Sequence, residues 1–408
     1  MANRALYAFM HGEPLGTFIE TGPDRATFTY EPSYSGTPLS LSLPLGSTPP
    51  EKAAYFYLEN LLPENEDGRR RLAHALETPN DTFGLISKIG EDVAGAVVLS
   101  PDPHLPERSS EPPLEATEDQ IAYWIATLKR DPSTPPPDGI KPRFSLAGQQ
   151  AKFSLSRVGD SWFWSTAQMP STHIFKPAFV QHEALHRAED ACLALASEIG
   201  VPASDSEIMR FRDQEVFAVR RWDRVGGARI HAEDLLQAYG EPWTDKYGMY
   251  ADDARRFMAN YGLEREYLRQ VLFNVAIGNA DAHAKNYSLL LAGDQVRLAP
   301  LYDAVPIFLY PQYSQNLCIS FSGNRYRLSD GITEADWIEW AETTGYDPDL
   351  VIDEMRTIFT EVSQRLPGVL EQAGLKPAMV DSAHRYVTHV RGSLPKAQRD
   401  QGHPRASR

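Results

Sequence analysis

The chain is poor in cysteine, with only Cys192 and Cys318 among its 408 residues, and these form no CxxC pair and no Cys/His ligand spacing. A zinc site is therefore not expected, and reduced, buried thiols are favoured over a disulfide framework. No run of 18 apolar residues occurs, which excludes a membrane-spanning helix. Residues 1–7 also lack the apolar core of a secretory signal. These absences predict a cytoplasmic protein without a membrane anchor.

Positive charge is in deficit, because 40 Lys and Arg residues stand against 55 Asp and Glu residues, which gives a net charge of −15. This balance argues against a broad basic face that binds nucleic acid unaided, but it does not exclude a local patch or binding through a partner. The hydrophobic share of 42% and the charged share of 23% are ordinary for a globular protein. With no internal repeat, the length predicts two or three domains with ample material for a core.

Composition and periodicity divide the chain into four segments. Residues 1–100 mix predicted strands and helices, and residues 101–140 form a Pro-rich linker around a short helix near 117–129. A larger unit covers 141–392, mixed up to about residue 223 and mainly helical after it. The basic tail, 393–408, has no apolar periodicity and is predicted to be disordered. This organisation predicts an α+β protein.

Asp281, Asn286 and Asp303 form the ordered set with the clearest chemical meaning. The first two lie in residues 278–286, and the third ends residues 300–303. An aspartate, an asparagine five residues later and a second aspartate after a predicted hairpin is the order in which kinases place a base and two magnesium ligands. Asp281 can accept the proton of an acceptor hydroxyl, whereas Asn286 and Asp303 offer the oxygen ligands that Mg²⁺ prefers. The set therefore predicts phosphoryl transfer that uses ATP and Mg²⁺.

The pattern around this set predicts a loop between a helix and a hairpin. Apolar residues recur at helical spacing over 267–276, and Gly278 is a helix stop signal. Residues 287–299 have the pattern of a hairpin, which would return the chain so that Asp303 lies near Asn286. Aspartate and asparagine are also common in surface turns, and either alone would fit that role. The ordered set favours a site.

A nucleotide site also needs positive charge at the phosphates. Lys176 ends the apolar segment 173–177, and a lysine in a buried strand must be paired or face a ligand. Glu189 lies thirteen residues later on a helix predicted over 184–199, and could pair with Lys176. The alternative is a lysine at a strand end that extends its charge into solvent.

Two further segments fit the same site less specifically. Residues 145–152 are small and polar, so their backbone N–H groups could bind phosphate oxygens, although the segment matches neither GxGxxG nor a Walker A sequence and would also fit a hairpin turn. Residues 217–224 have the pattern of a strand that enters a charged turn, where a hinge between two lobes would offer backbone groups to an adenine. A simple basic turn is the alternative for this second segment.

Together these residues resemble the HipA family, the serine/threonine kinase toxins of bacterial toxin–antitoxin pairs, over nearly the whole chain. Residues 38–44, 59–64 and 95–97 are similar to the family's N-terminal subdomain, residues 144–152 to its phosphate loop, residues 281–286 to its catalytic signature and residues 301–303 to its metal segment. The resemblance implies a small mixed N-terminal subdomain, followed by a two-lobed protein-kinase-like core with a mainly helical C-lobe. The nucleotide is expected between the lobes.

The resemblance implies a role for each candidate residue. Asp281 would be the catalytic base, and Asn286 and Asp303 would hold Mg²⁺. Lys176 would bind the phosphates, and Ser145 matches the serine that such kinases autophosphorylate. The other implied ATP-binding residues belong to the phosphate loop, the hinge and the catalytic loop with its support: Ala147, Gly148, Gln149, Gln150, Ala151, Lys152, Arg220, Arg221, Trp222, His283, Lys285 and Tyr302.

One position departs from the family pattern, since Arg220 stands where its better-known members have an acidic residue at the start of the hinge. A backbone contact to the adenine would tolerate this change, whereas a side-chain contact would alter nucleotide affinity. Residues 149–151 also differ from the family's phosphate loop. Phosphorylation of Ser145 would add roughly two negative charges beside a phosphate site, so ejection of the loop would be physically sensible.

The resemblance also implies partners. The expected substrate is an aminoacyl-tRNA synthetase or a similar translation protein. The expected partner is a small helix-turn-helix antitoxin, HipB-like, that binds operator DNA together with the kinase, which would act as a transcriptional corepressor. The net charge of −15 fits a toxin that uses a basic partner to reach DNA.

Two other functions stay open at this point. A small-molecule or lipid kinase could use a similar loop, because Asp-x-His-x-x-Asn is shared in outline with phosphoinositide kinases, but the N-terminal module has no obvious use there. A catalytically idle corepressor would only bind the antitoxin. The intact set of Asp281, Asn286, Asp303 and Lys176 argues against that alternative.

Overall fold

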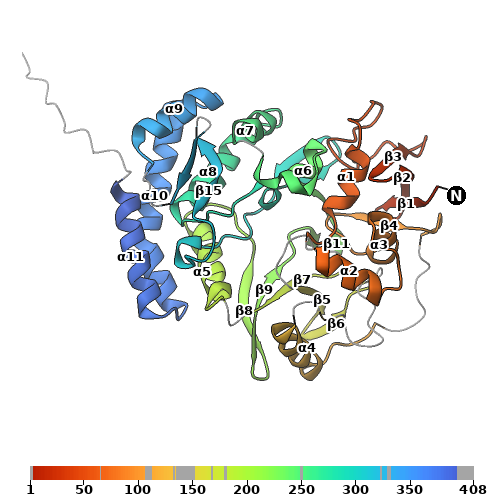
Figure 1. Cartoon of the computed structure of the whole chain (residues 1–408), viewed down its shortest axis with the longest axis horizontal. Coiled ribbons are helices and arrows are strands. Elements are labelled where there is room, and N and C mark those ends of the chain that lie inside the picture. Colours follow the sequence, from red (N-terminus) through yellow and green to blue (C-terminus); the bar gives the residue numbers. More distant parts are fainter. Residues whose placement is uncertain are drawn as a thin grey trace, which may run out of the picture.

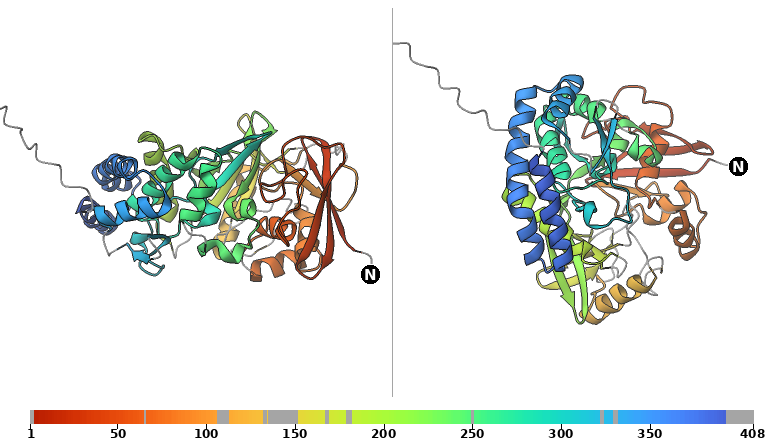
Figure 2. Two further views of the ribbon diagram at one scale, coloured as in Figure 1. Left: turned by 90° about the horizontal axis from the view of Figure 1, so that it is seen from above. Right: turned by 60° about the vertical axis from the view of Figure 1, so that its left-hand side comes forward.

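The computed structural model describes residues 3–64, 66–105, 113–131, 134, 152–166, 169–178, 182–248, 251–321, 324–328 and 332–392. The predictions for Ser145, for Ala147 to Ala151 and for the tail 393–408 lie outside these residues. An N-terminal unit, a lobe built on a five-stranded sheet and a mainly helical lobe form one elongated molecule, with the N-terminal unit and the last helices at opposite ends (Figure 1, Figure 2).

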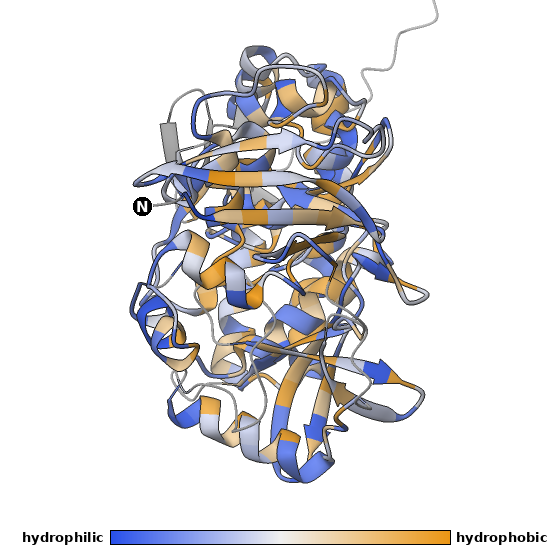
Figure 3. Cartoon of the chain, turned by 90° about the vertical axis from the view of Figure 1, so that its right-hand side faces the viewer, coloured by the Kyte–Doolittle hydropathy of each residue, from blue (hydrophilic) through white to orange (hydrophobic). Residues whose placement is uncertain are grey.

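The N-terminal unit packs an antiparallel sheet, in the order β3-β2-β1-β4, against three helices. Apolar residues on one face of the sheet build its core around the buried Leu6, Phe18 and Tyr57, and Figure 3 shows both apolar and polar residues along these strands. Gly16 is required in β2, since a Cβ there would lie 2.4 Å from Thr29 O. The elements are β1 (Ala5–Met10), β2 (Glu13–Gly22), β3 (Arg25–Tyr30), α1 (Ala53–Asn60), α2 (Glu66–Ala75), α3 (Thr82–Ile89) and β4 (Val97–Ser100).

The second unit, the N-lobe, is an antiparallel sheet in the order β6-β5-β7-β9-β8. Side chains alternate along strand β9, which lies between β7 and β8, so that Val216 and Ala218 join the core under α4, whereas Phe217 and Val219 join the core of α5 and the helical lobe. The elements are α4 (Glu118–Arg130), β5 (Phe153–Val158), β6 (Ser161–Trp164), β7 (His173–Pro177), α5 (Leu185–Glu198), β8 (Ser206–Phe211) and β9 (Gln214–Arg220). Helix α4 begins at a capping box of Thr117 and Gln120. It falls in the segment predicted as a linker but packs on this sheet.

The third unit, the C-lobe, is mainly helical and surrounds the central helix α8, most of whose side chains are buried. Its elements are β10 (Arg224–Val225), β11 (Ala228–Arg229), β12 (His231–Asp234), α6 (Leu235–Tyr239), η1 (Trp243–Tyr247), α7 (Ala251–Ala259), α8 (Glu264–Ala276), η2 (Ala284–Asn286), β13 (Ser288–Ala292), β14 (Gln295–Leu298), η3 (Ile307–Leu309), β15 (Asn316–Phe321), β16 (Asn324–Arg327), α9 (Glu334–Thr344), α10 (Pro348–Gln372) and α11 (Pro377–Gly392). Among the described helices, none is long and apolar enough to cross a membrane.

The N-terminal unit docks on the C-lobe through segment 38–44, in which Ser40 and Leu43 pair across a tight turn. The backbone N–H of Leu41 donates to Glu233 Oε1 at 2.9 Å, and Ser42 Oγ donates to the carbonyl of Gln237 at 2.7 Å. His231 Nε2 lies 2.7 Å from the carbonyl of Leu39. These bonds anchor the N-terminal unit to β12 and α6, and β12 pairs with β13 directly after the candidate catalytic loop.

Candidate active site

Lys176 joins the two lobes of the core. Strand β7 carries it, and its Nζ lies 2.7 Å from Glu189 Oε1 on α5. The same ammonium also binds Asp303 Oδ1 of the C-lobe. The side chains of Lys176 and Glu189 are buried, so each charge requires the other. The lysine therefore points between the lobes, where a phosphate would need it.

The electrostatics of this group are dominated by burial and by two ammonium groups. Burial alone would raise the pKa of the Asp303 carboxyl, but Lys176 and Lys152 outweigh it and hold that pKa well below its usual range. Burial lowers the pKa of Lys152 to about 8, and the charge of Lys176 adds to that effect. Burial also raises the pKa of Glu189 to about 7, against the attraction of Lys176. The site thus concentrates positive charge around an ionised Asp303.

Asp303 has a backbone conformation that is rare for a residue with a side chain, with φ at 57°. Its surroundings impose it, because Asn279 Nδ2 donates to the Asp303 carbonyl at 3.0 Å. The preceding Tyr302 is fixed too, since its hydroxyl donates to the Lys285 carbonyl at 2.7 Å. Backbone strain that the environment holds in place is typical of functional sites.

The catalytic-loop candidate follows α8 and folds back on itself. Gly278 ends the approach with φ at 70°, and a Cβ there would lie 2.7 Å from the ring of Phe308. Asn286 Nδ2 donates to the Asp281 carbonyl at 3.1 Å, so the five-residue spacing closes a tight loop. Because its amide nitrogen is engaged in this bond, Asn286 has its carbonyl oxygen left to offer to a cation.

Tyr247 contacts Asp281, and this contact was absent from the sequence predictions. Its hydroxyl donates to Asp281 Oδ1 at 2.9 Å from the end of η1. Burial raises the pKa of Asp281, and the hydrogen bond from Tyr247 partly offsets that increase. No motif marks Tyr247, since it lies 34 residues before Asp281 and meets it only through the fold.

The N-terminal unit also contributes to the surroundings of the site. Glu64 binds Lys246, the neighbour of Tyr247, with an N–O distance of 2.6 Å, and both side chains are buried. Lys285 Nζ lies 2.9 Å from Asn60 Oδ1 and 2.6 Å from Asp234 Oδ2. Asn60 and Glu64 fall in the segment 59–64, whose resemblance to the family was the one signal that could have pointed to them.

His283 and the hinge candidates Arg220, Arg221 and Trp222 differ in burial and in the residues that they contact. Burial lowers the pKa of His283 to about 4, and its ring packs edge-on against Tyr247. Arg220 is exposed, whereas Arg221 is buried and binds Asp223, so its side chain turns away from the site. Trp222 approaches Tyr302, with ring centroids 6.0 Å apart. A nucleotide at the hinge would therefore meet backbone and Trp222 rather than the Arg221 guanidinium.

The residues present fit a magnesium ion that is shared with a nucleotide. Mg²⁺ usually takes one or two protein ligands and completes its coordination with waters and phosphate oxygens. Asn286 and Asp303 can supply two such oxygens, and the side chain of Asp303 keeps 43% of its area exposed. No cluster of three His, Cys, Asp or Glu residues that could hold a metal alone occurs in the described part of the chain.

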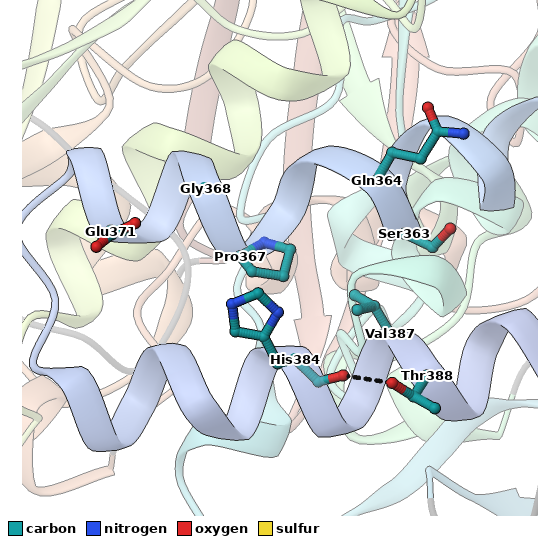
Figure 4. A pocket seen from close by; sticks show the side chains of 8 residues that line it. All are labelled: Ser363, Gln364, Pro367, Gly368, Glu371, His384, Val387 and Thr388. Carbon is teal, nitrogen blue, oxygen red and sulfur yellow. Dashed lines mark hydrogen bonds between the residues drawn. The ribbon is translucent and has the colours of Figure 1, made fainter.

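A groove between α10 and α11 is separate from this site. It is lined by Ser363, Gln364, Pro367, Gly368, Glu371, His384, Val387 and Thr388 (Figure 4). None of the candidate site residues that the structure describes lines it, and it lies at the end of the molecule away from the N-terminal unit (Figure 1).

Comparison with known proteins agrees with this architecture. Residues 6–100 match the HipA N-terminal domain, and residues 144–369 match the HipA-like C-terminal domain. The serine/threonine-protein kinase toxin HipA of Shewanella oneidensis is 29% identical over 397 residues, which cover 90% of this chain and 88% of that protein. Y4mE of Sinorhizobium fredii, which is named only as a candidate kinase, is 29% identical over 97% of each chain.

A solved structure supports the same assignment. The complex of Shewanella oneidensis HipA with HipB and operator DNA contains a chain that matches with a TM-score of 0.78 and 25% identity, over 95% of this chain and 96% of that one. The predicted α+β fold with a kinase-like core is thereby confirmed. Two family models, a relative that matches along most of its length and a similar solved structure place the chain in the HipA family of kinases.

Proposed function

We propose that the chain is a serine/threonine protein kinase that uses ATP and Mg²⁺ and acts as the toxin of a toxin–antitoxin pair. The observation that carries the proposal is the arrangement in which Lys176, paired with Glu189, meets Asp303 across the lobes. The loop closed by Asn286 and Asp281 lies on the same C-lobe segment. Phosphoryl transfer depends chiefly on such positioning and on neutralisation of the phosphate charge.

Each side chain has a task in the proposed reaction. Asp281 accepts the proton of the acceptor hydroxyl and orients that oxygen for attack. Lys176 and Lys152 bind phosphate oxygens through their ammonium groups. Asn286 and Asp303 hold the cation, which neutralises phosphate charge when it is bound. His283, neutral in its buried position, and Lys285, held by Asn60, keep the catalytic loop in place.

We further propose that the acceptor is an aminoacyl-tRNA synthetase and that Ser145 is the autophosphorylated residue that inactivates the kinase. A HipB-like antitoxin would bring the protein to operator DNA in the cytoplasm. The solved structure of Shewanella oneidensis HipA supports an antitoxin and operator DNA as partners, because it was determined with HipB and operator DNA. The net charge of −15 is consistent with a protein that reaches DNA through a partner.

Intact mass spectrometry before and after incubation with ATP and Mg²⁺ tests the proposal. We expect the wild-type protein to gain one phosphate, roughly 80 Da, on Ser145, and the Ser145→Ala variant to gain none while it still binds nucleotide. Protein treated with a phosphatase beforehand serves as the control for phosphate already present. If neither this protein nor a synthetase offered as substrate gains phosphate, the idle-corepressor function replaces the kinase.

Tyr247→Phe is expected to shift the acidic limb of the pH–rate profile to higher pH. Burial raises the pKa of Asp281 and the Tyr247 hydroxyl lowers it, so loss of the hydroxyl must raise that pKa further. A base with a raised pKa becomes ionised only at higher pH, and initial rates measured between pH 4 and 8 would show it. Tyr239→Phe, whose hydroxyl instead donates to the Asp253 carbonyl, is the control. A limb that stays in place or moves to lower pH contradicts the assignment of Asp281 as base.

A further inference from the structure

The short loop between α3 and β4 brings the N-terminal unit against the connection between the two kinase lobes. Asp92 in this loop is fully buried, and it lies among Arg221, Arg224 and Arg229. The loop approaches closely because Gly95 has φ at 77°, and a Cβ there would lie 2.7 Å from the carbonyl of Ala232 on β12. His231 belongs to both contacts, because its Nε2 lies 2.7 Å from the carbonyl of Leu39 and its Nδ1 lies 3.4 Å from the backbone N of Ala96. The loop therefore extends the docking of segment 38–44 as far as the lobe connection.

Asp92 binds both sides of the lobe connection. Its Oδ2 accepts from the backbone N–H of Ser171 at 3.0 Å, and Ser171 lies two residues before β7, the strand that carries Lys176. Its Oδ1 lies 3.0 Å from Arg224 Nη2 and 3.6 Å from Arg229 Nη2, on the β10–β11 hairpin that leads to β12. One carboxylate thus connects the N-lobe, the hairpin and the N-terminal unit.

Asp223 completes the network from within the connection. It accepts from Arg221 Nη2 at 2.7 Å, from Arg224 Nη1 at 2.8 Å and from the backbone N–H of Gly95 at 2.8 Å. The carbonyl of Val93 accepts from Arg221 Nη2 at 3.1 Å and from Arg224 Nη2 at 3.0 Å. The loop therefore holds the hinge by its backbone as well as by Asp92.

The charge count makes this junction sensitive to the loss of one group. Arg221, Arg224 and Arg229 face the carboxylates of Asp92 and Asp223, and all five side chains are buried or nearly so. Without Asp92, three guanidinium groups would face one carboxylate. A buried polar network that is only partly satisfied loses its fixed geometry and is costly. A substitution of Asp92 should therefore disturb the geometry of the lobe connection before that of other parts of the molecule.

We propose that Asp92 is a positioning residue for phosphoryl transfer: by clamping the lobe connection, it fixes Lys176 of the N-lobe over Asp303 and Asp281 of the C-lobe. The inference rests on the proposed kinase function. Phosphoryl transfer tolerates little misplacement between the phosphate-binding lysine and the base. The N-terminal unit is then a third structural part of the kinase, and it sets how closely the lobes meet.

Asp92→Asn tests the clamp, because the amide keeps the size of the side chain and removes its charge. We expect faster hydrogen exchange in residues 173–177 and 221–229, a raised KM for ATP, and kcat/KM lowered about tenfold. Ser171→Ala removes only the hydroxyl that accepts from Arg221 Nη1 at 2.8 Å, and we expect the same changes at about threefold. The second variant leaves no charge unpaired and should fold even if the first does not.

Glu354→Gln is the matched control. Glu354 is a buried carboxylate on α10 that binds Arg265 and Arg269, so the same chemical change is made away from the lobe connection. We expect it to lower the thermal midpoint while leaving exchange at 173–177 and the KM for ATP unchanged.

Each outcome either supports or overturns the proposed role of Asp92. Wild-type hydrogen exchange at 173–177 in Asp92→Asn overturns the clamp. A fall in kcat/KM that Glu354→Gln matches at equal folded fraction overturns it as well. If Asp92→Asn does not fold, Ser171→Ala decides by the same two readouts. If the wild-type protein transfers no phosphate, the proposed function is wrong, but the clamp can still be tested by hydrogen exchange in the presence of a non-hydrolysable ATP analogue. Faster exchange at 173–177 in the variants than in the wild type then supports the clamp, and equal exchange overturns it.

Discussion

Asp281→Asn is expected to lower the rate of phosphoryl transfer by about 10³-fold while it leaves the fold and nucleotide binding intact. The asparagine has the size of the aspartate, and its Oδ1 can still accept from Tyr247, so the local structure should persist. It cannot take a proton from the acceptor hydroxyl. The loss should therefore fall on kcat, with little change in the KM for ATP.

The measurement is the rate of phosphate incorporation under single-turnover conditions, with nucleotide binding measured in parallel. Asp245→Asn makes the same chemical change at an exposed position of η1 and should keep the wild-type rate. If Asp281→Asn transfers phosphate at the wild-type rate, Asp281 is not the base. If the variant instead loses nucleotide binding, its carboxylate acts at the nucleotide and not at the acceptor.

Asp303→Asn should produce a loss of similar size, about 10³-fold at low Mg²⁺, for a different reason. Lys176 and Lys152 keep Asp303 ionised, against the effect of burial on its pKa. The amide retains an oxygen ligand but removes the negative charge that attracts the cation. Lys176 retains Glu189 as its partner, so the N-lobe should stay in place.

Rates measured over a range of Mg²⁺ concentrations separate this effect from a loss of fold. We expect the concentration of Mg²⁺ for half-maximal rate to rise by at least tenfold, with partial recovery of the rate at high Mg²⁺. Asp294→Asn, at the exposed turn between β13 and β14, is the control and should behave as wild type. An unchanged Mg²⁺ dependence in Asp303→Asn would remove Asp303 from the metal site.

Local sequence patterns predicted several of the helices and strands around the site. The segment predicted as a helix over 267–276 and the hairpin over 287–299 correspond to α8 and to β13 with β14, because periodicity and turn chemistry act between neighbours in the chain. Strand β2 is harder to recognise in the sequence, since Pro14 and Gly16 weaken its strand pattern. Its Gly16 is there for close contact with Thr29, which the sequence does not reveal.

The surroundings of the site depended on contacts that no local pattern encodes. Lys285 was predicted from the loop motif, but its partner Asn60 lies 225 residues away. Arg221 was predicted at a nucleotide hinge that offers backbone groups, and the sequence did not indicate that its buried guanidinium binds Asp92 and Asp223. A charged residue gives no sign in sequence of whether it will be exposed or paired, since that depends on which surfaces meet.

By itself, the sequence determined the order of helices and strands around the loop 281–286 and the resemblance to the HipA family, because spacing and turn residues are local properties. Only the tertiary structure decided that Tyr247 contacts Asp281, that Lys176 bridges Glu189 and Asp303, and that Asp92 enters the lobe connection. These contacts form when separate units bury their surfaces together and must satisfy the charges they enclose, which is a condition on the whole fold and not on any segment.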